Sequence, residues 1–278
     1  MPESQIANKN NKTSPWAWIP SLYLASGLPY VVVMTVSVIM YKRLGVSNTE
    51  IALYTSWLYL PWVIKPFWSP LVDILKTKRL WIITMQLLIG AGLGGVALTI
   101  PTDDFLRTSL AFLWLLAFSS ATHDIAADGF YMLGLSKHDQ TWFVGIRSTF
   151  YRLAMIAGQG LLIMLAGLLE NLFQAETGAT SVAADPGVAL AWTITFYVMA
   201  GLFVLFFAWH RFVLPRPPAD VAKLQDSYAG IVRDFAVTFG DFFKRPKIGL
   251  ILAFLLLFRF SEAQRAKMAA PFLLDGEL

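Results

Sequence analysis

Ionisable side chains lie inside apolar stretches of this sequence, and their chemistry needs an explanation first. The stretch "SSATHDIAADGF" places His123, Asp124 and Asp128 at the end of a run that is otherwise long and apolar enough to cross a bilayer. A charged side chain costs on the order of 3 kcal/mol at the centre of a membrane helix. Such residues are stable there only if they pair or face water, so they predict a polar cavity between helices.

The two carboxylates are predicted to pair with arginines of the next apolar stretch. Asp124 and Asp128 are four residues apart, so they share one face of a helix. If the two stretches cross the membrane in opposite directions, a rise of about 1.5 Å per residue puts Asp124 level with Arg152, and Asp128 level with Arg147. These pairs either hold two helices together or contain carboxylates that take up and release a proton when their partners change.

Other ionisable residues extend the predicted cavity. His123 is either a neighbour in a hydrogen-bond network or a proton relay. Lys65 lies in a proline-rich apolar stretch, while Glu262 lies between Arg259 and Arg265 at three-residue steps. The last arrangement suits either the binding of a polar or ionic solute or an internal ladder of ion pairs.

The composition is that of a membrane protein and excludes several classes of site. The chain has 278 residues, of which 56% are hydrophobic and 14% charged. Its mean hydropathy is +0.58. Without cysteine it has no disulfide, thiolate metal site or cysteine nucleophile. No metal-ligand spacing, serine elbow or phosphate loop is present, and no basic face suits nucleic acid, so we expect no enzyme, metal, cofactor or nucleic-acid partner.

Seven apolar stretches are long enough to span a bilayer core about 30 Å thick. Lys and Arg concentrate in the N-terminal tail, in the second and fourth connections and in the long connection after the sixth span. This distribution predicts a multi-pass protein with a cytoplasmic N-terminus. The predicted spans are 16–41, 50–72, 80–100, 108–133, 143–169, 188–213 and 247–272.

The long connection predicts the domain organisation. Its apolar residues recur at steps of three and four, which predicts an amphipathic helix that lies on the membrane surface or packs on neighbouring loops. A long interruption after six spans is typical of transporters with two six-helix halves, whereas a seven-helix sensor is the alternative from another class. The predicted parts are a cytoplasmic tail (1–15), a six-helix bundle (16–213), a cytoplasmic linker (214–246) and a seventh helix that starts an incomplete second bundle (247–278).

Prolines and glycines predict bends and close helix contacts. Pro29 should kink the first span, and the second span contains three prolines, at positions 61, 66 and 70. The stretch "GAGLGG" in the third span, and Ala154, Gly158 and Gly160 in the fifth, should let neighbouring backbones approach closely.

Several motifs together resemble a known family. They are "LASGLPY" in the first span, "IKPFWSPLVD" at the end of the second, "HDIAADGF" in the fourth and "YRLAMIAGQG" in the fifth, with "FRFSEAQRAKMAAPF" consistent with the seventh. In this order they resemble the AmpG-like muropeptide permease branch of the major facilitator superfamily, which is related to the acetyl-coenzyme A transporters.

The resemblance implies an all-α membrane protein of the major facilitator type in the cytoplasmic (inner) membrane. It implies two six-helix halves, alternating access and proton-driven import of muropeptides; a same-fold carrier of sugar, peptide or acyl-coenzyme A is the alternative. The partners would be the lipid bilayer, a small polar solute and protons. Because the chain stops after a seventh span, we expect a fragment that needs its missing C-terminal half for activity.

The resemblance also assigns site residues. An acidic residue and following basic residues in the connection after the second span, here Asp73, Lys78 and Arg79, would latch against the other half. The ionisable residues identified above from their positions, Asp124, Asp128, Arg147 and Arg152 with His123, remain the candidates for proton coupling or ion pairing. The residues assigned to the substrate cavity are Tyr23, Ser26, Tyr30, Lys65, Ser120, Arg259, Glu262 and Arg265.

Overall fold

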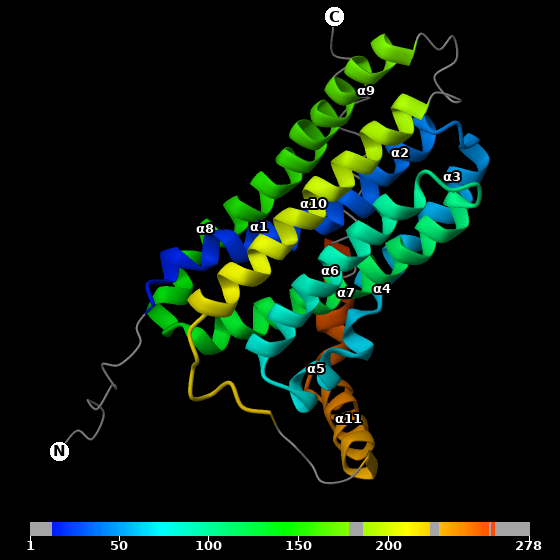
Figure 1. The fold of residues 1–278 in the computed structure, drawn as a ribbon. Coiled ribbons are helices and arrows are strands. Elements are labelled where there is room, and N and C mark those ends of the chain that lie inside the picture. Colours follow the sequence, from blue (N-terminus) through cyan, green and yellow to red (C-terminus); the bar gives the residue numbers. More distant parts are fainter. Residues whose placement is uncertain (1–12, 178–185, 223–227, 256, 259–278) are drawn as a thin grey trace, which may run out of the picture. The chain divides into compact units, whose positions relative to one another are not determined.

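The computed structural model describes residues 13–177, 186–222, 228–255 and 257–258. It divides into two units, residues 1–224 and 225–278. Every regular element among the described residues is helical, which confirms an all-α membrane protein (Figure 1). The predicted seventh span (247–272) is only partly described, with residues 248–255 helical. Arg259, Glu262 and Arg265 lie outside the described residues.

Five of the predicted spans are confirmed as helices long and apolar enough to cross a membrane. The first runs from Pro15 to Arg43 and contains α1 (Ile19–Val31) and α2 (Ser37–Arg43). The fifth contains α8 (Lys137–Ala157) and α9 (Ile163–Thr177). The others are α6 (Lys78–Thr99), α7 (Phe105–Gly134) and α10 (Pro186–Val213).

The predicted second span, over 50–72, is not one continuous helix and is interrupted at its prolines. This segment consists of α3 (Asn48–Thr55), α4 (Leu60–Val63) and α5 (Ser69–Leu75), joined by the 3₁₀ turns Ser56–Tyr59 and Lys65–Phe67. A proline stands within the first two positions of α4, of the turn at Lys65 and of α5. Proline has no N–H to donate and is tolerated only in the first turn of a helix, so each one restarts the helix.

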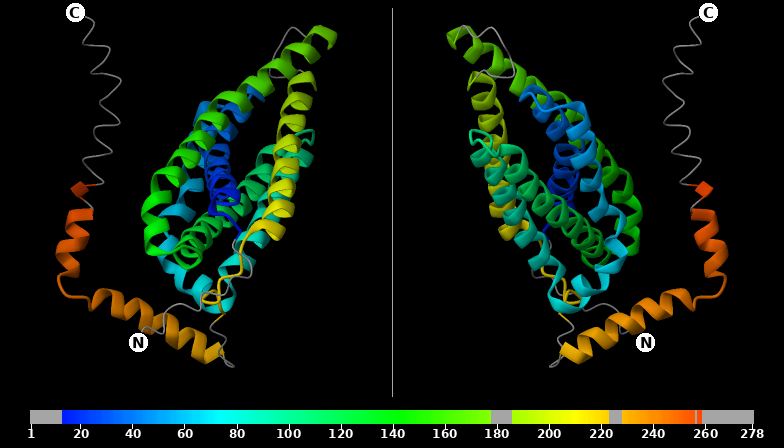
Figure 2. Two further views of the ribbon diagram at one scale, coloured as in Figure 1. Left: turned by 90° about the vertical axis from the view of Figure 1, so that its left-hand side faces the viewer. Right: turned by 90° about the vertical axis from the view of Figure 1, so that its right-hand side faces the viewer.

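The helices of the first unit form a bundle around the first span. Helix α1 packs against α8, α7 and α10, while α6 packs between α7 and α10 (Figures 1 and 2). The core contains fully buried Leu93, Leu116 and Phe203 at one end and Trp18 and Phe130 at the other. Large apolar side chains are also exposed along α8, α9 and α10, as expected for helices in lipid.

The first and fifth spans cross at matching irregularities. Pro29 lies within α1, and the backbone continues as a π-helix over Val32–Val36. The fifth span has its own π-helix at Gly158–Leu162, and the two π segments touch. A Cβ at Gly158 would lie 2.0 Å from Cγ1 of Val31, so only glycine permits this approach. The predicted close packing is confirmed at Gly158 but not at Gly160, where an added Cβ would have no described atom of another segment within 4 Å.

The second unit contains α11 (Tyr228–Phe243), within the predicted linker. Phe235 stacks on Phe239, and Phe239 contacts Phe243, with ring centroids 5.9 and 5.4 Å apart. These residues are four apart and therefore lie on one face of the helix. Arg233 is exposed. The helix has the aromatic stripe that the spacing of its apolar residues predicts.

The crossing predicts opposite effects for two glycines of one π segment. Gly158→Ala should lower the thermal unfolding temperature of the protein in detergent, because β-branched Val31 has little freedom to move away and overpacking costs about 1–3 kcal/mol. Gly160→Ala should leave it unchanged or raise it slightly, since alanine is the better helix former. Equal unfolding temperatures for the two variants would show that the crossing is not tight.

Candidate functional site

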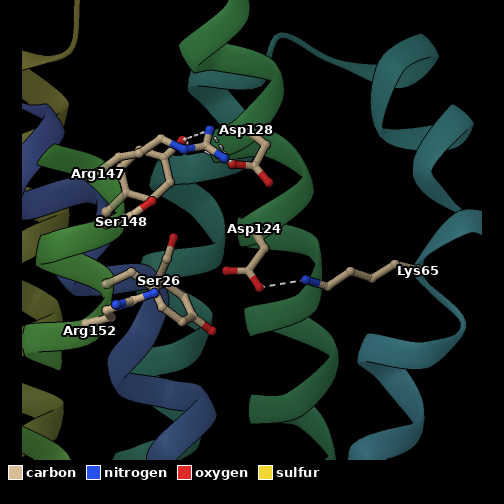
Figure 3. A pocket seen from close by; sticks show the side chains of 9 residues that line it. Ser26, Lys65, Asp124, Asp128, Arg147, Ser148 and Arg152 are labelled. Carbon is tan, nitrogen blue, oxygen red and sulfur yellow. Dashed lines mark hydrogen bonds and ion pairs between the residues drawn. The ribbon is translucent and has the colours of Figure 1, made fainter. Parts of the chain in front are cut away.

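A polar cavity of about 350 Å³ lies among the first, second, fourth and fifth spans. Its walls come from α1, the 3₁₀ turn at Lys65, α7 and α8 (Figure 3). Three cationic and two acidic side chains face it, so its lining has an excess of positive charge. The lining residues are Tyr23, Ser26, Lys65, Asp124, Asp128, Arg147, Ser148, Tyr151 and Arg152.

Lys65 and Asp124 form the deepest ion pair of the cavity. Nζ of Lys65 lies 2.6 Å from Oδ2 of Asp124, and their side chains are 26% and 12% exposed. The break in the second span carries Lys65 across to α7 (Figure 3). The other carboxylate oxygen, Oδ1, is buried without a hydrogen-bond partner among the described residues.

The predicted pairing of Asp124 with Arg152 is wrong. The prediction compared depths in the fourth and fifth spans alone and left the second span out of the comparison. The break at Pro66 brings a nearer cation, Lys65, to Asp124. Arg152 lines the same cavity, and its guanidinium makes no ion pair among the described residues.

The predicted pair of Asp128 and Arg147 is confirmed and includes a tyrosine. Nη1 of Arg147 lies 3.2 Å from Oδ1 of Asp128. The hydroxyl of Tyr23 donates to the same Oδ1 at 3.0 Å and accepts from Nη1 of Arg147 at 3.0 Å. The guanidinium also lies over the rings of Tyr23 and Tyr131, 5.0 and 4.8 Å from their centroids. Helices α1, α7 and α8 are thus joined by one polar cluster.

His123 lies behind the cavity wall, fully buried, as part of a hydrogen-bond network. Its ring contacts Ser26 Oγ at 3.2 Å and the amide of Gln86 at 3.1 Å. Gln86 also contacts His210, whose other ring nitrogen lies 3.0 Å from Oγ of Ser21. The role as a network neighbour is confirmed, whereas a proton relay stays a prediction. Sequence reasoning missed Gln86 and His210, although polar residues in apolar spans signal them.

Two residues assigned to the cavity do not line it. The ring of Tyr30 packs edge-on against Tyr59 and Trp62, with centroids 6.4 and 5.2 Å away. Ser120 is fully buried, and its Oγ has no hydrogen-bond partner among the described residues. Both residues belong to spans that border the cavity, but their side chains lie on faces of those spans that do not line it. Ser148 and Tyr151, which sequence reasoning did not single out, share the α8 face with Arg147 and Arg152.

Asp73, Lys78 and Arg79 make their described contacts within the first unit. Asp73 forms an ion pair with Lys78. The carboxylate of Asp220 accepts the backbone N–H groups of Lys78 and Arg79 at 2.6 and 3.0 Å, at the start of α6. Arg79 donates to the carbonyl of Leu214 at the end of α10. These contacts tie residues 214–220 to α6; a latch to a second half remains a prediction.

A second buried ion pair joins the far ends of three helices. Glu170 of α9 is 4% exposed, and its Oε2 lies 2.9 Å from Nε of Arg43. Its Oε1 accepts from the indole of Trp192 at 2.7 Å. Arg43 lies just beyond the predicted first span (16–41) and Glu170 just beyond the fifth (143–169), and sequence reasoning did not single out this pair. The contact ties α2, α9 and α10 together away from the cavity.

Comparison with known proteins identifies the family. A family model described as the BT1 family matches residues 25–260. The chain belongs to the BT1 family. It is 27% identical over 270 residues to the putative transporter AmpG 4 of Rickettsia conorii. The aligned region covers 91% of this chain and 58% of the relative. It is 25% identical to the anhydromuropeptide permease of Escherichia coli K12, over 92% of the chain and 48% of the relative.

These comparisons confirm the resemblance to AmpG-like transporters. The relatives' names describe permeases and transporters rather than enzymes. The chain spans about half the length of the curated relatives it matches. An uncharacterized protein of Haemophilus influenzae is also similar, 26% identical over 90% of the chain and 55% of its own length.

The ion pair of the cavity predicts which charge swap preserves the fold. Lys65→Asp and Asp124→Lys should each lower the unfolding temperature in detergent, because removing one partner of a buried pair costs about 3–5 kcal/mol. The double variant Lys65→Asp/Asp124→Lys should recover much of the loss. The matched double variant Asp124→Arg/Arg152→Asp should not recover it. If Asp124→Arg/Arg152→Asp recovered the unfolding temperature and Lys65→Asp/Asp124→Lys did not, Arg152 would be the partner of Asp124.

Proposed function

We propose that this chain forms one six-helix half of a secondary transporter that moves a small polar solute by alternating access. One observation carries the proposal: three separate spans of an apolar bundle contribute ionic side chains to a single cavity of about 350 Å³, and a fourth contributes Tyr23 and Ser26. Ionisable residues within membrane spans typically mark a solute or proton path. The family supports this function, since its matched relatives are named as transporters.

The cavity suits solute binding better than a purely structural role. A buried ion pair contributes little net stability, because desolvation offsets the attraction between its charges. Two ion pairs and an additional arginine would therefore be a poor way to stabilise a bundle. Arg152, unlike Lys65 and Arg147, faces the cavity without a carboxylate partner among the described residues. We infer that it binds an anionic group of the solute, which a bidentate guanidinium recognises well.

The finer assignment is proton-coupled import of muropeptides through the cytoplasmic membrane, with the N-terminus inside. Two features of the chain support it. A muropeptide carries carboxylates and amides, which match a cavity with excess positive charge and several hydroxyl groups. Asp124 has one oxygen bound to Lys65 and one without a described partner, so a proton can bind when Lys65 moves away. The uneven distribution of Lys and Arg supports the orientation.

The other side of the path would come from a second set of helices. In transporters of this type the solute site lies between two halves that rock about it. Since the chain spans about half the length of its matched relatives, we propose that its cavity forms one wall of the site. Transport then requires the second half, whereas solute binding to this wall contributes part of the affinity.

Uptake of labelled anhydromuropeptide by permease-deficient cells that express the native gene tests this function. Uptake should require the gene and should collapse when a protonophore is added. Arg152→Gln should raise the KM about tenfold or more, since a charge-assisted hydrogen bond contributes about 1.5–3 kcal/mol. Arg107→Gln, the same change at an exposed position outside the cavity, should leave the KM unchanged. Uptake that is unchanged by the protonophore would refute proton coupling. Equal KM values for Arg152→Gln and the unsubstituted protein would refute the role of Arg152.

A further inference from the structure

A buried chain of polar side chains runs from the cavity into the bundle. It connects Ser26, His123, Gln86, His210 and Ser21, and so joins α1, α7, α6 and α10. The three central side chains are 0% exposed. Ser26 alone belongs both to this chain and to the cavity lining. A contact that sets the direction of the Ser26 O–H bond therefore changes the hydrogen bonds that the cavity can offer to a solute.

The contact with Gln86 determines where His123 carries its hydrogen. Nε2 of Gln86 lies 3.1 Å from Nε2 of His123. In this orientation of the Gln86 amide, its nitrogen faces His123 and donates, so this ring nitrogen of His123 is the acceptor. The hydrogen of the neutral imidazole then lies on Nδ1, which is 3.2 Å from Oγ of Ser26. Ser26 consequently accepts this bond, and its own hydroxyl hydrogen is free for another acceptor.

The far end of the chain holds the amide of Gln86 in place. Its Nε2 and Oε1 lie 2.9 and 3.1 Å from Nδ1 of His210. Either tautomer of His210 can satisfy one of these atoms, and in both cases the amide keeps a hydrogen for His123. His210 is held in turn by the contact of its Nε2 with Ser21 and by the ring of Phe206, 6.0 Å away and nearly parallel.

We propose that Gln86 and His123 are positioning residues that make Ser26 a hydrogen-bond donor toward the cavity. Ser26 and Asp124 both line the cavity, so this hydroxyl hydrogen is available there to the carboxylate of Asp124 or to a carbonyl or carboxylate oxygen of a bound solute. The cavity thus selects an acceptor oxygen at Ser26 in addition to an anionic group at Arg152. The predicted effect on solute uptake rests on the proposed function, whereas the predicted position of the imidazole hydrogen of His123 does not.

Nuclear magnetic resonance of the imidazole nitrogens tests the position of the hydrogen directly. The chain has three histidines, at positions 123, 138 and 210, so labelling with ¹⁵N-histidine gives few signals. Exposed His138→Asn identifies the signals of His138, and His210→Asn those of His210. In the unsubstituted protein His123 should show hydrogen on Nδ1 and none on Nε2. Hydrogen on Nε2 would overturn the proposal whether or not the protein transports anything.

A double-variant cycle tests whether Gln86 acts through Ser26. Ser26→Ala and Gln86→Met should each raise the KM for uptake about three- to tenfold, with a smaller change in the maximal rate. In the Ser26→Ala background, Gln86→Met should add nothing, because its effect passes through the missing hydroxyl. Ser37→Ala removes another buried hydroxyl of the first span, one that donates to the carbonyl of Val33 and lies outside the polar chain and the cavity lining, and it should leave the KM nearly unchanged.

Two outcomes of the cycle would overturn the proposal. If Gln86→Met raised the KM equally with and without the Ser26 hydroxyl, Gln86 would act on the fold and not on Ser26. If Ser37→Ala matched Ser26→Ala, the effect would come from loosening of the first span. Each variant is first compared with the unsubstituted protein by thermal unfolding. If a variant does not fold, the position of the His123 hydrogen is tested instead by the ¹⁵N signals of the unsubstituted protein.

Discussion

A charge inside an apolar bundle must find an opposite charge or water, and this constraint explains most of the structure. The carboxylate of Asp124 lies well inside α7, where lipid cannot solvate it. It meets Lys65, which the bundle can supply only because the second span is broken at that level. Asp128, Arg147 and the hydroxyl of Tyr23 satisfy the same requirement one helical turn away. The cavity is the space these groups need, and it is also suited to a polar solute.

The departures from regular helix are what make this arrangement possible. Three prolines restart the second span and turn Lys65 toward α7. A π segment follows Pro29 in the first span and touches the π segment at Gly158 in the fifth, so the two walls of the cavity meet at a close crossing. Irregular backbone within a membrane is tolerated where neighbouring helices or a cavity satisfy its polar groups. Such segments are also where helices can bend as a transporter changes state.

Five of the spans and the pair of Asp128 with Arg147 could be predicted from sequence because they depend on local periodicity and depth. The partner of Asp124 could not, since depth alone does not say where a broken helix places Lys65. Gln86 stands alone among apolar residues and His210 precedes Arg211 at the end of its span, and only the packing of α6 against α7 and α10 shows that they meet. The rotation of each span decided the remaining differences: Tyr30 and Ser120 lie on faces turned from the cavity, whereas Ser148 and Tyr151 face it.

The central claim, that the charged residues border one wettable chamber, is tested most directly by thiol accessibility. The chain has no cysteine, so single cysteines can be introduced without background. A cysteine in place of Ser148, which lines the cavity, should react quickly with a charged, water-borne thiol reagent, because reaction requires the hydrated thiolate. A cysteine in place of Leu161, which is exposed on the apolar surface, should react slowly in a membrane. An inert cysteine at 148, or equal rates at both positions, would contradict the account.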